Sequence, residues 1–193
     1  MLTRRTMLLA VAALPLARVA WAQGDPATGL VEKLARELVG VVNGPGSAAD
    51  KQAALARLVV RDVDVTAVAR FCLGRYWRTA TPDQQRDYLA LFQRVLVKNI
   101  TSKVGEYTGV TITIGRSQPR DDEMVVSSVV TRPGNAPTRV DWVVTAGKVV
   151  DVVAEGTSLR LTQRSDYSAF LSQNGGNVQA LINAMKQQAS QPG

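Results

Sequence analysis

The segment "TRVDWVVTAGKVVDVVAEGTS", residues 138–158, contains two apolar stretches joined by the short turn "AGK". In the first stretch Val140, Trp142 and Val144 occupy alternate positions, which is the period of a strand with one buried face. Glycines within the turn and at Gly156 mark the tight turns that bound strands. The segment therefore predicts two neighbouring antiparallel strands.

Two further strands are predicted upstream of this pair. Residues 110–114, "VTITI", alternate apolar and threonine side chains, and residues 123–131, "EMVVSSVVT", are rich in the β-branched residues that favour strands. Four consecutive strands with short connections indicate an antiparallel meander. Its predicted apolar face consists of Val110, Ile112, Ile114, Val140, Trp142 and Val144.

Helical patterns precede and follow the strands. Apolar residues recur at helical spacing in 28–42 and 49–60, and Asp64 is a candidate cap for a further helix. The sequence "TPDQ" at 81–84 has the order of a capping box with proline at the first helical position, and this helix is predicted to reach residue 105. These patterns predict an α+β fold, a curved four-stranded antiparallel meander wrapped by helices on one face. The order of helices and then a curved sheet resembles the NTF2-like architecture.

Residues 1–22 have the layout of a bacterial export signal, with a charged start, an apolar middle and small residues before the expected cleavage point. The paired arginines in "TRRTML" resemble the twin-arginine export pattern, with an ordinary charged start as the alternative. We expect a periplasmic mature protein that forms a single domain over 23–193, with a disordered tail from about residue 189.

The composition narrows the possible chemistry. The chain has 193 residues, a formal net charge of +7, one cysteine and no histidine. Without histidine, Ser-His-Asp, Cys-His and zinc chemistry are excluded or handicapped, so no catalytic residue and no metal site are predicted. Cys72 lies between apolar neighbours and is expected to be a small buried residue. Basic residues do not run together with interleaved aromatics, so nucleic acid is not an expected partner.

The helices offer apolar side chains that could face the sheet. These are Phe71, Trp77, Phe92, Leu96 and Ile100. Periodicity alone does not distinguish a filled core from a lined cavity, because both need apolar side chains at the same positions.

Several motifs in order resemble the MlaC family of periplasmic phospholipid-binding proteins, also called the toluene-tolerance family. Residues 70–96, "RFCLGRYWRTATPDQQRDYLALFQRVL", contain LG-x-x-W followed by T-P-x-Q, and "VVDVVAEGTS" (149–158) and "LTQRSDYSAFL" (161–171) match later motifs. The likeness extends from about residue 28 to residue 186.

The resemblance implies a deep apolar pocket that takes the acyl chains of a phospholipid. The pocket candidates are Phe71, Trp77, Phe92, Leu96, Ile100, Ile112, Ile114, Val140, Trp142 and Val144, with Arg164 as a head-group candidate. It also implies a lipid shuttle between an outer-membrane lipoprotein complex and an inner-membrane ABC transporter with an MCE-type subunit, a role in outer-membrane lipid asymmetry that needs no cofactor. Enclosure is the physical requirement, since each exposed methylene costs about 0.8 kcal/mol in water.

Alternatives remain at this point. Gly147, Val150 and Ile100 depart from aromatic residues of the family, so a hopanoid-type cargo is conceivable. An NTF2-like enzyme acting on an apolar molecule would need a carboxylate in the pocket, but alternation places Asp141 opposite Trp142. A scaffold protein with a dry core is the third possibility. Asp151 and Glu155 could form a general acid and base pair, but we expect them to lie on the solvent side or to bind arginine and backbone donors of "TQRSD". For Arg164, pairing with Glu155 or Asp166 is the alternative to a head group.

Overall fold

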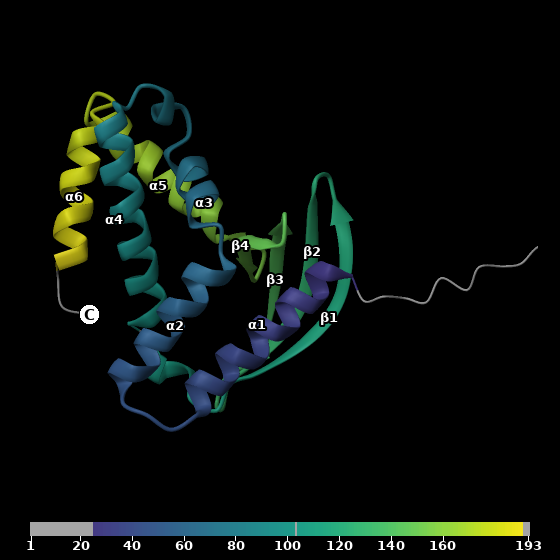
Figure 1. Cartoon of the computed structure of the whole chain (residues 1–193). Coiled ribbons are helices and arrows are strands. Elements are labelled where there is room, and N and C mark those ends of the chain that lie inside the picture. Colours follow the sequence, from purple (N-terminus) through teal and green to yellow (C-terminus); the bar gives the residue numbers. More distant parts are fainter. Residues whose placement is uncertain (1–24, 103, 191–193) are drawn as a thin grey trace, which may run out of the picture.

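The computed structural model describes residues 25–102 and 104–190, which form helices around an antiparallel sheet (Figure 1). The helices are α1 (Pro26–Asn43), α2 (Ala48–Asp62), α3 (Val65–Leu73), η1 (Gly74–Arg78), α4 (Pro82–Thr101), η2 (Val104–Tyr107), α5 (Leu159–Gln173) and α6 (Val178–Ser190), where η marks a 3-10 helix. The strands are β1 (Thr111–Arg120), β2 (Glu123–Thr131), β3 (Thr138–Thr145), β4 (Lys148–Ala154) and β5 (Thr157–Ser158). The predicted signal, residues 1–22, lies outside the described residues.

The predicted helix caps are present. Asp64 accepts a 2.9 Å hydrogen bond from the backbone N–H of Ala67. Thr81 and Gln84 form the reciprocal capping box that opens α4. The same helix ends at Thr101, four residues before the predicted end, and η2 follows it. α6 continues through Ser190, so it includes the start of the predicted disordered tail, and residues 191–193 lie outside the described residues.

The sheet is open, with strand order β1-β2-β3-β4-β5 and antiparallel pairing throughout. The predicted α+β meander is confirmed, with a fifth strand of two residues added at the β4 edge. Ala146 and Gly147 join β3 to β4 with φ of 49° and 72°. Two consecutive positive φ angles give a turn whose twist matches that of the strands, and the pairing of β3 with β4 shifts register once, between Val143 and Val144.

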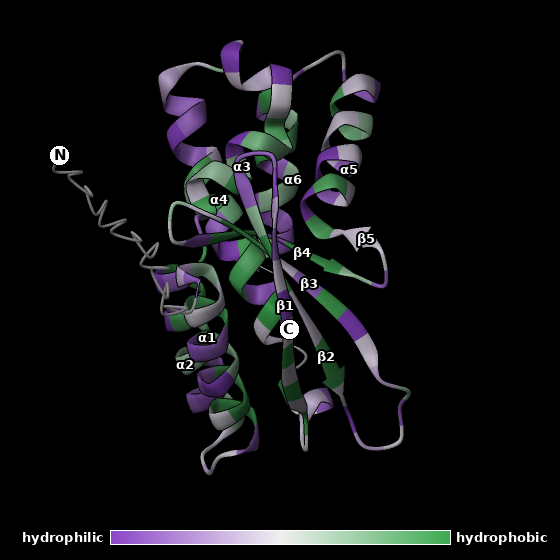
Figure 2. Cartoon of the chain, turned by 90° about the vertical axis from the view of Figure 1, so that its right-hand side faces the viewer, coloured by the Kyte–Doolittle hydropathy of each residue, from purple (hydrophilic) through white to green (hydrophobic). Residues whose placement is uncertain are grey.

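Helices contact both faces of the sheet, whereas the sequence predicted helices on one face. α1 lies against β1 and β2, while α3 and α5 contact β4 (Figure 1). Figure 2 shows α1 and α2 as a pair beside the strands, with α3 and α5 toward the other end of the molecule. Successive residues of β3 therefore enter different cores: Trp142 packs with α1 and α2, and Val143 packs with the other helices.

Within residues 25–102 and 104–190, no helix combines the length and the apolarity needed to cross a membrane.

Candidate functional site

Apolar side chains fill the space between one face of the sheet and the helix pair α1–α2, and we call this set the apolar layer. Its buried members are Ala27, Val31, Leu34, Val42, Leu55, Leu58, Val104, Val110, Val126, Val140, Trp142, Val144 and Val149. Ile112, Ile114 and Val152 are partly buried against them. Burial of one such side chain contributes about 1.5–3 kcal/mol, so this layer is a main reason why α1 and α2 stay on the sheet.

The polar groups within the apolar layer bind one another. The indole N–H of Trp142 donates a 2.9 Å hydrogen bond to the hydroxyl of Ser128, which in turn donates a 2.9 Å bond to the carbonyl of Val140. Ser128 is 2% exposed and is paired across the sheet with Ile114 and Val140, so it stands in the middle of the apolar face. Because these groups are satisfied internally, the face behaves toward a neighbour as a hydrocarbon surface.

Polar bonds hold both ends of α1 against the first strand. Ser117 of β1 donates a 2.5 Å hydrogen bond to Asp25, the N-cap of α1. Asn43, the last residue of α1, donates a 2.9 Å bond to the carbonyl of Val110 and accepts a 2.8 Å bond from the N–H of Gly109. The bond from Ser117 is the main cause that holds the pKa of Asp25 below its ordinary value. Directional contacts thus fix the ends of α1, and the apolar layer lies between them.

A hollow of about 570 Å³ opens at the surface between α1 and α2. Its lining consists of Glu37, Gly40, Val41, Ala54, Arg57, Leu58 and Arg61. Leu58 is a buried member of the apolar layer and Val41 packs against that layer, so the hollow borders it directly. Arg61 is held by Glu37 at 2.6 Å, whereas Arg57 has no polar partner among the described residues. A free cation therefore stands beside an opening to the apolar layer.

Nine of the ten predicted pocket residues are divided between two apolar clusters. Five of them contribute to the apolar layer: Ile112, Ile114, Val140, Trp142 and Val144. Four belong to a second cluster, which lies among α3, α4, α5 and α6 and which we call the upper core; its buried residues include Cys72, Tyr88 and Tyr167. These four are Phe71, Trp77, Phe92 and Leu96. Ile100 is 40% exposed and belongs to neither cluster. The structure does not bring these ten residues around one space, and their contact with lipid stays a prediction.

The upper core is filled by its own side chains. The rings of Tyr88, Phe92 and Tyr167 contact one another with centroids 5.8–6.3 Å apart. Tyr88 is fully buried and donates a 2.8 Å hydrogen bond to the carbonyl of Ala69, and burial raises the pKa of its phenol. Cys72 is also fully buried, as predicted, with its sulfur 3.6 Å from a backbone carbonyl oxygen. This core supports the fold as a packed interior.

Asp151 of the "VVDVVAEGTS" motif joins the sheet to α5. It accepts a 2.6 Å hydrogen bond from the hydroxyl of Ser158 and a 3.0 Å bond from the backbone N–H of Arg160. The guanidinium of Arg160 stands 3.5 Å from Asp151 and 2.8 Å from Glu123. The partners of Asp151 are of the predicted type, an arginine and a backbone N–H. They belong to Arg160 in the first turn of α5, however, and not to "TQRSD" (162–166). Glu155 is exposed in the turn, with a φ of 51°.

Arg164, the predicted head-group residue, lies at the seam of α3 and α5. Its guanidinium carbon is 4.7 Å from the centre of the Phe71 ring, and Arg160 approaches the same ring at 4.9 Å. No ion pair of Arg164 with Glu155 or Asp166 occurs in the described part of the chain. The arginine is thus held by an aromatic ring, and its role toward a head group stays a prediction.

Some residues of this site were not predicted from sequence. Asp25 precedes a proline at the start of α1, and Asn43 opens the helix-breaking sequence "NGPG"; both are local cap signals. The contact of Asp25 with β1, and that of Asn43 with the two residues before β1, depend on the tertiary fold. No local sequence pattern marks Ser128, because its role depends on the strand register that places it beside Trp142. Asp141, the candidate carboxylate of an enzyme, pairs with Arg139 at 3.2 Å on the opposite face, as alternation predicted.

These features define an α+β protein in which an apolar layer separates an open antiparallel sheet from a pair of helices. The chain belongs to the MlaC protein family, whose model matches residues 32–187. That segment begins in α1 and ends in α6, so it includes most of the apolar layer, whose members Ala27 and Val31 precede it, and the buried residues of the upper core.

One solved structure with the same fold is a phospholipid-binding protein from Ralstonia solanacearum in complex with a phospholipid. Its TM-score is 0.73 at 22% sequence identity, and the match covers 85% of this chain and 97% of that chain. At this identity the likeness establishes the shared fold.

Proposed function

We propose that this protein is a periplasmic carrier that encloses the acyl chains of a phospholipid between its sheet and α1–α2. The observation that carries the proposal is the apolar layer, in which Ser128 and Trp142 satisfy each other and leave a hydrocarbon face. Membership of the MlaC family and the phospholipid in the Ralstonia solanacearum structure support phospholipid as the ligand.

Acyl chains can replace side chains in the apolar layer because both make the same nonpolar contacts. An acyl chain that enters the apolar layer replaces side-chain contacts with methylene contacts, and each methylene removed from water gains about 0.8 kcal/mol. Contacts of this kind are not directional, so the sheet and α1 can separate without breaking hydrogen bonds in the layer. The anchors at Asp25 and Asn43 would keep α1 attached while its middle is displaced.

The hollow between α1 and α2 is the proposed mouth. Acyl chains would pass Leu58 into the layer, and the phosphate of the head group would remain near Arg57. Arg164 is the competing candidate from the sequence. Replacing each arginine by glutamine and measuring retained phospholipid separates the two roles, because only the residue that holds the head group should affect retention.

The signal predicted in residues 1–22 would export the chain to the periplasm, where a carrier is needed because acyl chains cannot cross water unprotected. By its family, we assign it the transfer step between an outer-membrane lipoprotein complex and an inner-membrane ABC transporter with an MCE-type subunit. Such a transfer makes and breaks no covalent bond, so the protein needs no catalytic residues for it.

Native mass spectrometry of the protein taken from its own periplasm without detergent tests the proposal. We expect a one-to-one adduct whose mass, after lipid extraction, is that of a phospholipid. An adduct with the mass of a polycyclic hopanoid would support the carrier function but show that the cargo is a hopanoid and not a phospholipid. A protein that is free of lipid and also fails to take up added phospholipid would overturn the proposal.

A further inference from the structure

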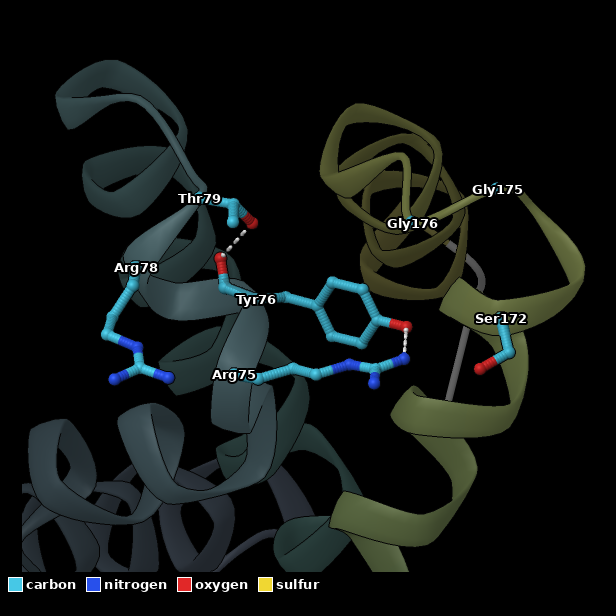
Figure 3. Close-up of a pocket in the computed structure, with 7 residues that line it drawn as sticks. All are labelled: Arg75, Tyr76, Arg78, Thr79, Ser172, Gly175 and Gly176. Carbon is cyan, nitrogen blue, oxygen red and sulfur yellow. Dashed lines mark hydrogen bonds between the residues drawn. The ribbon is translucent and has the colours of Figure 1, made fainter.

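A second hollow, of about 660 Å³, lies where η1 meets the turn between α5 and α6 (Figure 3). We call it the corner hollow. Its lining consists of Arg75, Tyr76, Arg78, Thr79, Ser172, Gly175 and Gly176. None of these residues belongs to the apolar layer, so the corner hollow is separate from the proposed lipid site.

Two arginines give the corner hollow its charge. Arg75 donates a 2.8 Å hydrogen bond to the phenol oxygen of Tyr76, and its guanidinium carbon stands 4.8 Å from the centre of that ring. These contacts hold one side of the guanidinium and leave its other N–H groups for a ligand. Arg78 has no polar partner among the described residues. The lining includes no carboxylate, so nothing in it neutralises the two cations.

Hydroxyl groups stand around the same opening. Figure 3 shows Arg75 and Tyr76 extending toward Ser172 across the gap between η1 and the end of α5. The bond from Arg75, followed by one with Ser172, holds the pKa of the Tyr76 phenol below its ordinary value. Thr79 donates to the backbone carbonyl of Tyr76 at 3.1 Å. The Thr79 proton is used within the chain, whereas the Tyr76–Ser172 pair keeps one O–H donor beside the Arg75 guanidinium, and proteins bind oxyanions with such combinations of charged and hydroxyl donors.

The two glycines keep the hollow open. A Cβ atom at position 176 would come within 3.2 Å of the Tyr76 ring, and at position 175 it would extend into open space. Both residues have positive φ, 63° at Gly175 and 77° at Gly176, which favours glycine over other residues. The turn thus lies close to Tyr76 without a side chain that would fill the opening.

We propose that the corner hollow binds a phosphate group. The N–H groups that Arg75 leaves free and the remaining O–H of the Tyr76–Ser172 pair suit a ligand with several acceptor oxygens and a negative charge, and arginine matches phosphate oxygens with paired donors. The Arg78 side chain extends away from Ser172 in Figure 3 and adds positive charge to the lining. The phosphate could belong to the head group of an anionic phospholipid at a membrane surface, or it could be free inorganic phosphate. The inference does not rest on the carrier function, since it uses no residue of the apolar layer.

Titration of the protein with inorganic phosphate, followed by NMR at the Arg75 side-chain N–H and the backbone N–H of Gly175, tests the chemistry. We expect saturable shifts at both groups, and about tenfold weaker binding in Arg75→Gln, the loss typical of one charge-assisted donor. Arg75→Lys should also weaken binding, because lysine keeps the charge but loses the paired donors. The control Arg94→Gln/Arg116→Gln changes two exposed arginines elsewhere and should bind phosphate like the unchanged protein. The absence of saturable shifts, or an equal loss in the control, would overturn the proposal.

Co-sedimentation with vesicles distinguishes the two sources. The probes are vesicles of phosphatidylcholine alone and vesicles that also contain phosphatidylglycerol. The decisive result is that the protein prefers the vesicles that contain phosphatidylglycerol, and that Arg75→Gln/Arg78→Gln loses this preference while the control pair keeps it. That result would identify the phosphate of a lipid head group as the ligand. Phosphate binding without that preference assigns the free ion. Retained phospholipid, measured by mass spectrometry in the same variants, should be unchanged, so this test fails or succeeds independently of the carrier proposal.

Discussion

Trp142 and Ser128 form a buried hydrogen bond of 2.9 Å between β3 and β2, inside an otherwise apolar layer. Ser128→Ala should lower the free energy of unfolding by about 1–3 kcal/mol, because the indole N–H loses its buried acceptor. Adding Trp142→Phe removes the orphaned donor, so the double variant should lose less than the sum of the two single losses. Urea denaturation of all four proteins measures this coupling. Strictly additive losses would show that the hydrogen bond does not matter to stability.

The face of β3 that carries Val140 and Val144 should be essential for lipid retention. An arginine at either position would place a charge in the apolar layer, and acyl chains would have to share that space with it. We expect Val140→Arg and Val144→Arg to be isolated without lipid while far-ultraviolet circular dichroism still shows helices. Val129→Arg is the matched control, because Val129 is 43% exposed on the opposite face of the sheet and its replacement should leave lipid content unchanged. A folded Val140→Arg protein with normal lipid content would contradict the assignment of this face.

Asn43 should govern how firmly α1 closes on the sheet. Asn43→Ala removes the bonds to Gly109 and Val110 and should cost about 1–3 kcal/mol of stability. If α1 moves during exchange, a fluorescent phospholipid should also leave this variant faster in a transfer assay with acceptor vesicles. Asn99→Ala, an exposed change in α4, serves as the control. Reduced stability with an unchanged transfer rate would show that exchange does not require movement of α1.

Acid should loosen the other end of α1. The hydrogen bond from Ser117 is the main cause that lowers the pKa of Asp25 below its ordinary value of 3.8. A group with a lowered pKa in the folded state stabilises the fold above its unfolded pKa, and this contribution is lost as the pH falls through the folded pKa. The anchor should therefore hold at neutral pH and weaken only below about pH 4.

Carbon-13 NMR of the carboxyl groups measures this titration. Ser117→Ala should raise the midpoint of Asp25 toward the ordinary value. Asp50, whose pKa is lowered by Ser47 in the cap of α2, should titrate as before and provides an internal control. An unchanged Asp25 midpoint would mean that the bond from Ser117 does not exist in solution.

Asp151 should matter more for stability than Asp141, although both are on neighbouring strands. Asp151→Ala leaves the Ser158 hydroxyl and the Arg160 backbone N–H without their acceptor, although the Arg160 guanidinium keeps Glu123, and each unsatisfied buried donor costs about 1–3 kcal/mol. Asp141 pairs with an arginine whose side chain is 69% exposed, so Asp141→Ala should cost no more than about 1 kcal/mol. Thermal unfolding of the two variants would show similar losses if Asp151 were only a surface acid.

Features that depend on neighbouring residues could be predicted from sequence. The bounds of β2 agree with the predicted strand 123–131, and the capping box at Thr81 is present, because strand alternation and helix caps are encoded locally. The strand residues of the site could be predicted from sequence for the same reason. Alternation correctly placed Val140, Trp142 and Val144 on one face.

The helical half of the site could not be predicted in the same way. An apolar stripe shows that a helix is buried on one side, but it does not tell which face of the sheet that side meets. Phe71 and Phe92 were therefore assigned to the same space as Trp142, while the fold places them in the upper core. The hollows next to Arg57 and Arg75 also depend on elements far apart in the sequence, so no local pattern marks them.

Burial of Cys72 makes its thiol unreactive toward oxidants and alkylating reagents. Burial is the main cause that raises the pKa of this cysteine to about 12, so almost no thiolate exists at neutral pH to be oxidised or alkylated. Two copies of the chain therefore have no exposed thiol through which to form an intermolecular disulfide. A cysteine introduced on the outer side of α1 would be the sole thiol to react with a dye, and the opening of the molecule could be followed without first removing Cys72.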